Sequence, residues 1–381
     1  MDLTLGIFNQ FPYPFIDEYH DFPRPSRQFD PIKGHQLYTE YLDEYIYADK
    51  LGFDILTFNE HHSKEYNLDV APHLMASYLI GQTKRARLLP TGSILPLHNP
   101  IRIAEEYAML DVISGGRMIA GFERGGITNY LAYGVPIQAK QKFEEACQLI
   151  VKAWTADEPF QWKGKHYQFD AVSVWPRPYQ KPHPPIHTAG PSPAFAAEMG
   201  ASYGLWVQPT SEIRGTFARY RDAYVKAHRE EPTNDKVVLV RDVYVSENDD
   251  RAEEECAKHL LYMYRTLWKP GMMAVKKVEA DVGYKLFWAS RLFLTEMDYS
   301  KLAEVGMIIA GSPESVVEQI LNQQKEIGFG TFVGEFRFGN MPHQLAKRSM
   351  ELFAKEVMPQ FKSESRAEAA TSTAALVAGK I

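Results

Sequence analysis

Short apolar segments alternate with longer amphipathic segments along most of this chain, and this alternation limits the fold more than any other feature. Eight apolar segments have the length and composition of buried strands: 3–8, 53–58, 88–94, 117–122, 185–189, 204–208, 237–245 and 331–336. Most of them are followed by a segment with helical spacing, and 138–154 is the clearest example. Strands and helices in alternation predict parallel βαβ units.

Eight strands with intervening helices match an α/β fold of the (β/α)8 TIM barrel type, and an open doubly wound sheet is the alternative. The chain has 381 residues, so its length exceeds the roughly 250 typical of a barrel. Two insertions account for the excess. After strand four, segment 160–169 is a predicted hairpin that turns at Gly164, and a Pro-rich stretch follows it. After strand seven, a second insertion covers about 269–305. We predict one domain over 1–361 and a disordered tail over 362–381.

The charge and the cysteine content limit the classes of partner. Forty-two Lys and Arg against 48 Asp and Glu give a formal net charge of −6. The chain therefore lacks the basic field that nucleic acid or an anionic membrane surface requires.

No apolar run reaches the roughly 18 residues that span a bilayer, and the start of the chain lacks the features of a signal peptide. Two cysteines cannot form a disulfide framework. We expect a cytoplasmic protein that acts on a small molecule.

Glycines and an arginine follow two predicted strands that are neighbours in a barrel. Arg124 and Gly125 come after the fourth strand, while Gly190 and Ser192 come after the fifth, where a helix begins. A strand-end arginine, glycines and a helix N-terminus are suited to binding phosphate. Taken alone, the second segment also fits an ordinary helix cap. Since neither a GxGxxG motif nor a P-loop follows any strand, a mononucleotide fits better than a dinucleotide.

Two adjacent histidines, His61 and His62, follow the second predicted strand. Adjacent residues of an extended chain point to opposite sides, so the pair does not readily share a metal, and the sequence has no HxH or HExxH pattern. We expect no metal. A histidine above a barrel mouth is suited to hydrogen bonding or proton transfer, and a structural role is the alternative. A hydrolase with paired carboxylates stays open, because Glu60, Glu123 and Glu335 lie at strand ends.

Three segments together resemble the luciferase-like flavin monooxygenases, the family of bacterial luciferase. They are LGFDILTFNEHHSKEY at 51–66, the stretch 88–125 and the stretch 175–204, and their order and spacing agree with the family's. The resemblance covers about 1–245 and 308–360. It implies a barrel that binds FMNH2 and reacts it with O2 to form a flavin C4a-hydroperoxide. That species oxygenates a small apolar organic substrate such as an aldehyde or ketone.

The resemblance also implies roles for partners and for single residues. A separate flavin reductase supplies FMNH2, and the chain forms a homodimer or a heterodimer with a homologous chain. His61 matches the histidine that the chemistry needs, and Arg124 matches the arginine at the flavin phosphate. Thr91 and Gly92 fall where the family often has a non-prolyl cis peptide beneath the isoalloxazine ring. The remaining cofactor contacts are Gly125, Gly190 and Ser192, and the candidate substrate contacts are Phe8, Asn59, Glu123 and Trp206.

One departure from the family is Glu123, which stands where bacterial luciferase has a reactive cysteine. This argues against simple identity with the light-emitting enzyme. The carboxylate tunes flavin access, contacts substrate or pairs with Arg124, or else it points to the surface. We expect the aromatic and Met-rich segment 261–293 to be a lid that is mobile without flavin. Two other functions stay open, namely a non-catalytic flavin-binding partner subunit and a deazaflavin-dependent dehydrogenase on the same barrel.

Overall fold

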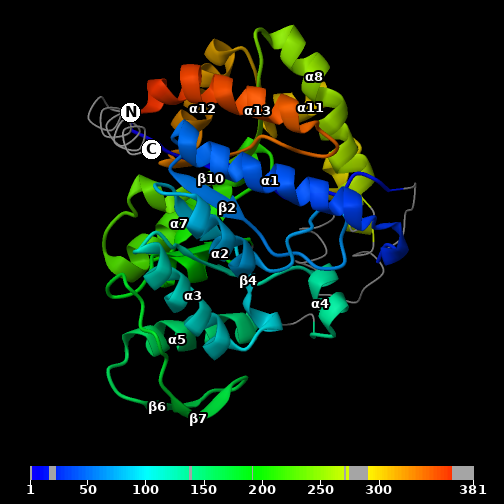
Figure 1. Cartoon of the computed structure of the whole chain (residues 1–381). Helices are drawn as coiled ribbons and strands as arrows, with labels where there is room; N and C mark the ends of the chain where they lie inside the picture. Colours follow the sequence, from blue (N-terminus) through cyan, green and yellow to red (C-terminus); the bar gives the residue numbers. More distant parts are fainter. Residues whose placement is uncertain are drawn as a thin grey trace, which may run out of the picture.

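The computed structural model describes residues 2–16, 23–136, 140–190, 192–269, 272–273 and 291–362. A sheet of parallel strands forms its centre, and helices cover the outside of this sheet (Figure 1). Its strands are β1 (Thr4–Phe8), β2 (Ile55–Phe58), β3 (Arg87–Pro90), β4 (Ser93–Ile94), β5 (Ala120–Glu123), β8 (Ile186–Ala189), β9 (Ser202–Leu205), β10 (Val237–Val245), β11 (Ile308–Gly311) and β12 (Thr331–Glu335). The α-helices are α1 (Pro31–Leu51), α2 (Pro72–Gln82), α3 (Pro100–Ser114), α4 (Ile127–Tyr133), α5 (Lys140–Thr155), α6 (Pro193–Glu198), α7 (Thr210–His228), α8 (Asp249–Tyr262), α11 (Tyr299–Glu304), α12 (Pro313–Ile327) and α13 (His343–Leu352).

The sheet closes through β3 and β4, which are separated only by Thr91 and Gly92. Neighbouring strands follow the order β3-β2-β1-β12-β10-β9-β8-β5-β4. Each of these pairs is parallel. Leu88 of β3 also bridges to Met118, just before β5. Because β3 and β4 belong to one stretch of chain, the two ends of this order meet. The predicted (β/α)8 barrel is confirmed.

One strand of the sheet, β11, has no counterpart in the sequence prediction. It pairs with the carboxyl-terminal half of β10, from Asp242 opposite Ile308 to Val245 opposite Gly311, and lies off the barrel path. The long strand β10 pairs with β12 through its first part, so its far end extends beyond the barrel and accepts this extra partner. A four-residue strand directly after an insertion carries too little pattern to be recognised.

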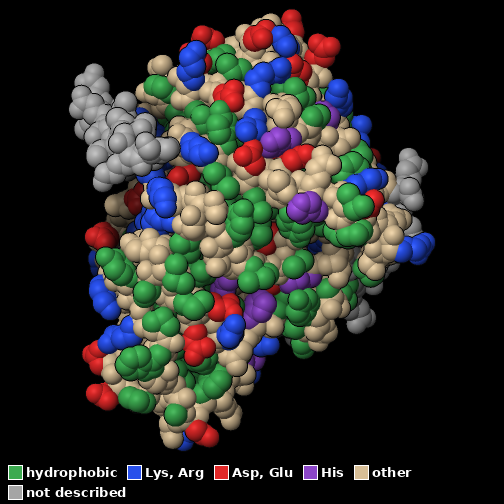
Figure 2. All heavy atoms as spheres, viewed as in Figure 1, with side chains coloured by type: hydrophobic (Ala, Val, Ile, Leu, Met, Phe, Trp, Pro, Cys, Tyr) green, Lys and Arg blue, Asp and Glu red, His purple; other side chains and the backbone are tan. Residues whose placement is uncertain are grey.

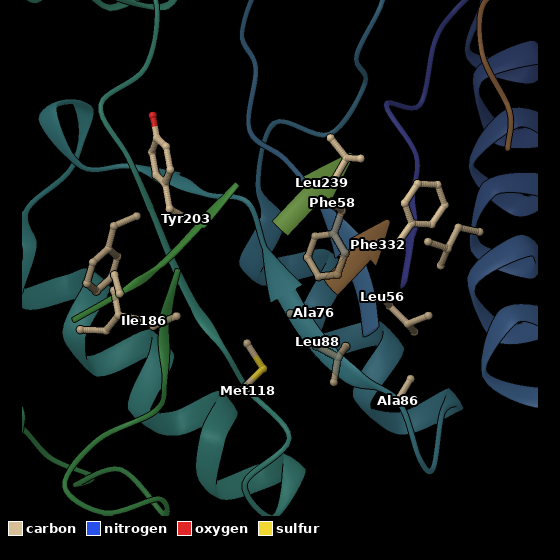
Figure 3. Close-up of a cluster of buried hydrophobic side chains, with 14 of the residues drawn as sticks. Leu56, Phe58, Ala76, Ala86, Leu88, Met118, Ile186, Tyr203, Leu239 and Phe332 are labelled. Atoms are coloured by element: carbon tan, nitrogen blue, oxygen red, sulfur yellow. The ribbon is translucent and has the colours of Figure 1, made fainter. Parts of the chain in front are cut away.

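The alternation of side chains along the strands separates the interior of the barrel from the layer beneath the helices. Val238 and Val240 of β10 face a cavity inside the barrel, while Leu239 between them is fully buried on the other side. Figure 3 shows this outer layer, in which Leu56, Leu88 and Phe332 lie near Ala76 of α2. The outward apolar side chains of the strands thus pack against the helices. The inward side chains line the interior of the barrel, where a site can form.

Capping residues decide where the helices begin and end. The carboxylate of Asp30 accepts hydrogen bonds from the backbone N–H groups of Ile32 and Lys33, and Pro31 occupies the first helical position of α1. The helix ends at Gly52, whose φ of 98° is readily adopted only by glycine. The apolar pattern alone predicts a later start, near Leu37, because Leu37 is the first large apolar residue of α1 that is buried.

The predicted hairpin is confirmed, since β6 (Phe160–Lys163) and β7 (Gln168–Val172) pair antiparallel and project away from the barrel (Figure 1). Gly164 lies in the turn, where its N–H donates to the carbonyl of Tyr167. Much of the second insertion, 274–290, and the tail from 363 lie outside the described residues. The mobile lid and the domain boundary at 361 therefore stay predictions.

The surface agrees with the small net charge. On the face shown in Figure 2, acidic and basic side chains are interspersed over the helices. Within the described part of the chain, no helix combines the length and the apolarity that crossing a membrane needs.

Candidate active site

A cavity of about 290 Å³ opens at the carboxyl ends of the barrel strands. It is where catalytic groups of such barrels gather. All of the predicted site residues except Ser192 line it: Phe8, Asn59, His61, Thr91, Gly92, Glu123, Arg124, Gly125, Gly190 and Trp206. Ser192 precedes α6 and makes no side-chain capping hydrogen bond, so the ordinary helix-cap interpretation is wrong for its hydroxyl.

Asn129 of α4 orients His61. Its Oδ1 accepts a hydrogen bond from the His62 backbone N–H at 3.2 Å, which turns its amide nitrogen toward His61. That nitrogen lies 3.5 Å from Nδ1 of His61. Since an amide nitrogen only donates, Nδ1 is the acceptor and the ring proton resides on Nε2. Burial, with help from Lys64 and His62, holds the pKa of His61 well below its usual range. The ring is therefore a neutral imidazole at neutral pH.

His62 has a different role, because it belongs to a network around Glu60. Nε2 of His62 lies 2.6 Å from Oε1 of Glu60, and Nε2 of His98 lies 2.7 Å from the same oxygen. The other oxygen accepts the N–H of Ile94 at 2.9 Å. Burial alone would raise the pKa of Glu60, but the hydrogen bonds from His62 and His98 outweigh it and lower the pKa to about 2. Glu60 is thus a fixed anion that ties β2 to β4.

The peptide bond between Thr91 and Gly92 is cis, as the resemblance implies. The N–H of Thr91 donates to the carbonyl of Phe58 at 2.6 Å, which joins this bend to β2. A Cβ atom at Gly92 would come 2.7 Å from the backbone of Gly121. A residue with a side chain is therefore excluded from this part of the cavity wall.

Glu123 points into the cavity, so the interpretation of a surface carboxylate is wrong. Burial raises the pKa of Glu123 to about 7, although the backbone N–H of Ala189 and the charge of Arg124 act in the opposite direction. Its Oε2 lies 3.9 Å from the point where a Cβ of Gly190 would be. The carboxyl group therefore stands between the two predicted phosphate segments.

The two segments are side by side because β5 and β8 pair. Gly125 and Gly190 have φ angles of 80° and 89°, in the left-handed region that favours glycine. Arg124 lines the cavity between them, and its carbonyl accepts the hydroxyl of Tyr130. An arginine and two glycines thus converge at this end, as predicted from the sequence.

Two of the three strand-end carboxyl groups, Glu60 and Glu123, line the cavity. Glu60 is held by two histidines, and Glu335 is fully buried and does not line the cavity. Burial and the neighbouring carboxyl of Asp242 raise the pKa of Glu335 well above its usual range. Because Glu60 is already bound by His62 and His98, it is poorly suited to act as the second carboxyl group that glycoside hydrolysis requires.

Several residues that line the cavity do not lie at strand ends, and they were not predicted from the sequence. Lys64 and Tyr66 come from the loop after β2, and Trp268 ends a π-helical turn that continues α8. Arg291 comes from the predicted second insertion, where it is 5% exposed, and burial lowers its pKa to about 10. The KEY sequence at 64–66 follows the two histidines closely, and Trp268 and Arg291 belong to the segment 261–293 that was predicted to be a lid.

Aromatic rings form one wall of the cavity. The ring of Trp206 lies 5.1 Å from Phe8 on one side and 5.1 Å from Trp268 on the other. Tyr66 lies 6.4 Å from Trp268 and 5.2 Å from His61. Edge-to-face contacts of this kind stabilise the wall and keep it apolar.

Comparison with known proteins agrees with this arrangement. The model of the luciferase-like monooxygenase family matches residues 25–330. A similar protein is the oxygenase component of the flavin-dependent trigonelline monooxygenase of Acinetobacter baylyi, which is 26% identical over 371 residues, 93% of this chain and 98% of the relative.

Solved structures share the fold. The oxygenating constituent of 3,6-diketocamphane monooxygenase from Pseudomonas putida, a type II Baeyer-Villiger enzyme in complex with FMN, has a TM-score of 0.75 at 20% identity, over 94% of this chain and 99% of that chain. An F420-dependent secondary alcohol dehydrogenase has a TM-score of 0.69 at 16% identity, over 95% and 100%. Since the family model matches most of the barrel, the chain belongs to the luciferase-like monooxygenase family.

Proposed function

We propose that this flavin-dependent monooxygenase is the oxygenase component of a two-component system. It takes FMNH2 from a separate reductase and uses O2, by way of the flavin C4a-hydroperoxide, to oxygenate a small apolar organic substrate. One observation carries the proposal. The neutral His61, the cis bend at Thr91 and Gly92 and the cationic end at Arg124 all line one cavity.

The residues at the ends of β5 and β8 fit a phosphate group. The guanidinium group of Arg124 supplies positive charge and can donate two hydrogen bonds to one phosphate group. Gly125 and Gly190 have no side chains, so a phosphate can approach the backbone there. Arg291 supplies a second cation on the cavity wall. It interacts electrostatically with Glu212 and with Tyr203, whose hydroxyl donates to the carbonyl of Gly190. In a chain of net charge −6, such local cations are needed to hold an anionic cofactor.

The flavin, when bound, activates dioxygen, and His61 serves that chemistry by hydrogen bonding. With Nδ1 engaged by Asn129, Nε2–H is the donor available to an oxygen atom above the cis bend. Because the imidazole is neutral, its Nε2–H can donate a hydrogen bond without bringing a buried positive charge to the cavity. The aromatic wall of Phe8, Trp206 and Trp268 limits access of water, which suppresses loss of hydrogen peroxide.

Two alternatives share the barrel. The deazaflavin-dependent dehydrogenase is represented by a structure with the same fold. A non-catalytic flavin-binding subunit is disfavoured, because His61 faces the cavity and is oriented for hydrogen bonding. Pairing into a homodimer, or with a homologous chain, is part of the proposal.

Anaerobic titration of the purified chain separates these cofactors. We expect saturable binding of FMNH2, with reduced riboflavin bound at least tenfold more weakly, because each good charged hydrogen bond to phosphate contributes about 1.5–3 kcal/mol. The reduced deazaflavin cofactor should also bind more weakly than FMNH2. Tighter binding of the deazaflavin would favour the dehydrogenase and overturn the assignment.

A further inference from the structure

Lys64 places an amine on the wall of the cavity beside His61. Its Nζ donates a hydrogen bond to the hydroxyl of Tyr66 at 2.6 Å and lies 4.9 Å from the centre of the same ring. Both residues line the cavity, as does His61, whose ring is 5.2 Å from that of Tyr66. The amine is thus held in a defined position next to the groups proposed for catalysis.

Within the described residues, no carboxylate forms an ion pair with this amine. The adjacent Glu65 is engaged elsewhere, since its Oε1 lies 2.9 Å from Nε of Arg24. Glu60 is engaged by His62 and His98. Burial lowers the pKa of Lys64 to about 7, with Glu65 acting in the opposite direction. A buried cation is normally paired with an anion. An anionic group of a ligand would therefore stabilise the protonated, charged form of the Lys64 amine.

The amine lies on the aromatic side of the cavity. Tyr66, which binds it, contacts Trp268, and Trp268 contacts Trp206. In the order of strands around the barrel, β2 is separated from the adjacent β5 and β8 by β3 and β4 on one side and by four strands on the other. Lys64 therefore lies on the β2 side of the cavity, one continuous stretch of chain (β3 and β4) away from β5, whereas Arg124 and Gly190 lie at the ends of β5 and β8.

We propose that Lys64 binds a carboxylate of the organic substrate, whose apolar or aromatic body packs against Tyr66, Trp206 and Trp268. The substrate class is then an organic acid rather than a neutral aldehyde or ketone. This inference rests on the proposed function, because it concerns the substrate side of the same cavity. It assigns Lys64 a role in substrate specificity and leaves cofactor binding to Arg124 and its neighbours.

The test compares acids with their amides on the FMN-loaded protein, by titration calorimetry. The probes are benzoate and benzamide, phenylacetate and phenylacetamide, and octanoate and octanamide. We expect at least one acid to bind more tightly than its amide, and Lys64→Met to remove that preference with a loss of about tenfold or more for the acid. Lys64→Arg retains the charge and should retain the preference.

Lys33→Met is the matched control. Lys33 is exposed on α1, and its Nζ lies 4.9 Å from the ring centre of Phe15, the same distance as Lys64 from Tyr66. Its removal should leave acid binding unchanged. The proposal is overturned if no acid binds more tightly than its amide, or if the preference survives in Lys64→Met.

A second measurement separates the substrate anion from the flavin phosphate. The affinity of Lys64→Met for FMNH2 and for reduced riboflavin should equal that of the unaltered protein. If the variant instead loses its preference for FMNH2 over riboflavin, the amine binds the cofactor, which overturns this inference and leaves the monooxygenase assignment standing. If the unaltered protein binds no FMNH2, the proposed function fails, and the comparison of acids with amides can still be made on the flavin-free chain.

Discussion

Nε2 of His62 lies 2.6 Å from Oε1 of Glu60, so the second histidine of the EHH sequence is bound to the glutamate that precedes the pair. The first histidine faces the cavity and is oriented by Asn129. The two adjacent histidines therefore have different surroundings, and we propose a chemical role for the first and a structural role for the second. Substitution of each in turn tests this division.

Replacing His61 with Asn should lower the rate of product formation at least a hundredfold, because the donor at Nε2 is lost, while FMNH2 affinity changes little. Replacing His62 with Asn should instead destabilise the fold by about 1–3 kcal/mol, since Glu60 would lose a buried partner. Turnover with saturating flavin and urea unfolding distinguish the two. A stable His62 variant that is as inactive as the His61 variant would contradict the division.

Glu123 should make flavin binding depend on pH. Because its pKa is raised to about 7, the carboxyl is mostly protonated below pH 7 and becomes an anion above it. An anion beside the phosphate segments repels FMN, so the dissociation constant should rise several-fold between pH 6 and pH 8.5. Glu123→Gln should remove this rise, and any slope that remains in the variant comes from the phosphate group itself. Identical slopes in the two proteins would refute the role of Glu123.

Arg124 and Arg291 should account for the preference for FMN over riboflavin. Arg124→Ala should weaken FMN binding by about tenfold or more and leave riboflavin binding nearly unchanged, because the lost contacts go to phosphate. Arg291→Ala should have the same effect if it faces that end of the cavity, as its position near Tyr203 indicates. Fluorescence titration with the two flavins measures both. Equal losses of affinity for FMN and for riboflavin would show that these arginines do not bind the phosphate group.

Asp242 and Glu335 should lower the stability of the protein as pH rises. They are opposite each other on β10 and β12, and both are fully buried. Burial raises the pKa of Asp242 to about 7, and burial with the Asp242 charge raises that of Glu335 well above its usual range. Their folded-state values exceed the unfolded values of about 4. The folded state then binds more protons, so this contribution to stability is present at low pH and lost as pH rises through 7.

Glu335→Gln isolates that effect, because the amide still donates to Asp242 and cannot ionise. Urea unfolding should find the variant more stable than the unaltered protein by at least about 1–2 kcal/mol at pH 8, and nearly equal to it at pH 4. A difference that is the same at both values would show that the pair does not titrate in this range.

The barrel was predictable because its strands carry the signal themselves. Residues 237–245 form β10 with the predicted bounds, since its run of strand-forming residues, interrupted only by Arg241 and Asp242, is flanked by turn residues. The start of α1 was not predictable from periodicity, because Asp30 and Pro31 set it and no large apolar side chain is buried before Leu37. The short β11 exists only because β10 extends beyond its barrel neighbours.

The site was predictable where it lies at strand ends and not where it depends on distant contacts. His61, Arg124 and Gly190 follow strands directly, and the barrel brings them together. Arg291 reaches the cavity from an insertion, with no local pattern. The binding of Glu60 by His98, 38 positions away, likewise depends on tertiary packing. Such contacts follow from the closed sheet and not from spacing along the chain.

Rapid mixing of the anaerobic FMNH2 complex with oxygenated buffer tests the monooxygenase assignment most directly. We predict a flavin hydroperoxide absorbance that forms within the mixing experiment and decays slowly, and that decays faster when a substrate is present. In His61→Asn the species should decay to oxidised FMN and hydrogen peroxide without product. Direct oxidation of bound FMNH2 with no intermediate, at the rate of free flavin, would contradict the proposed function.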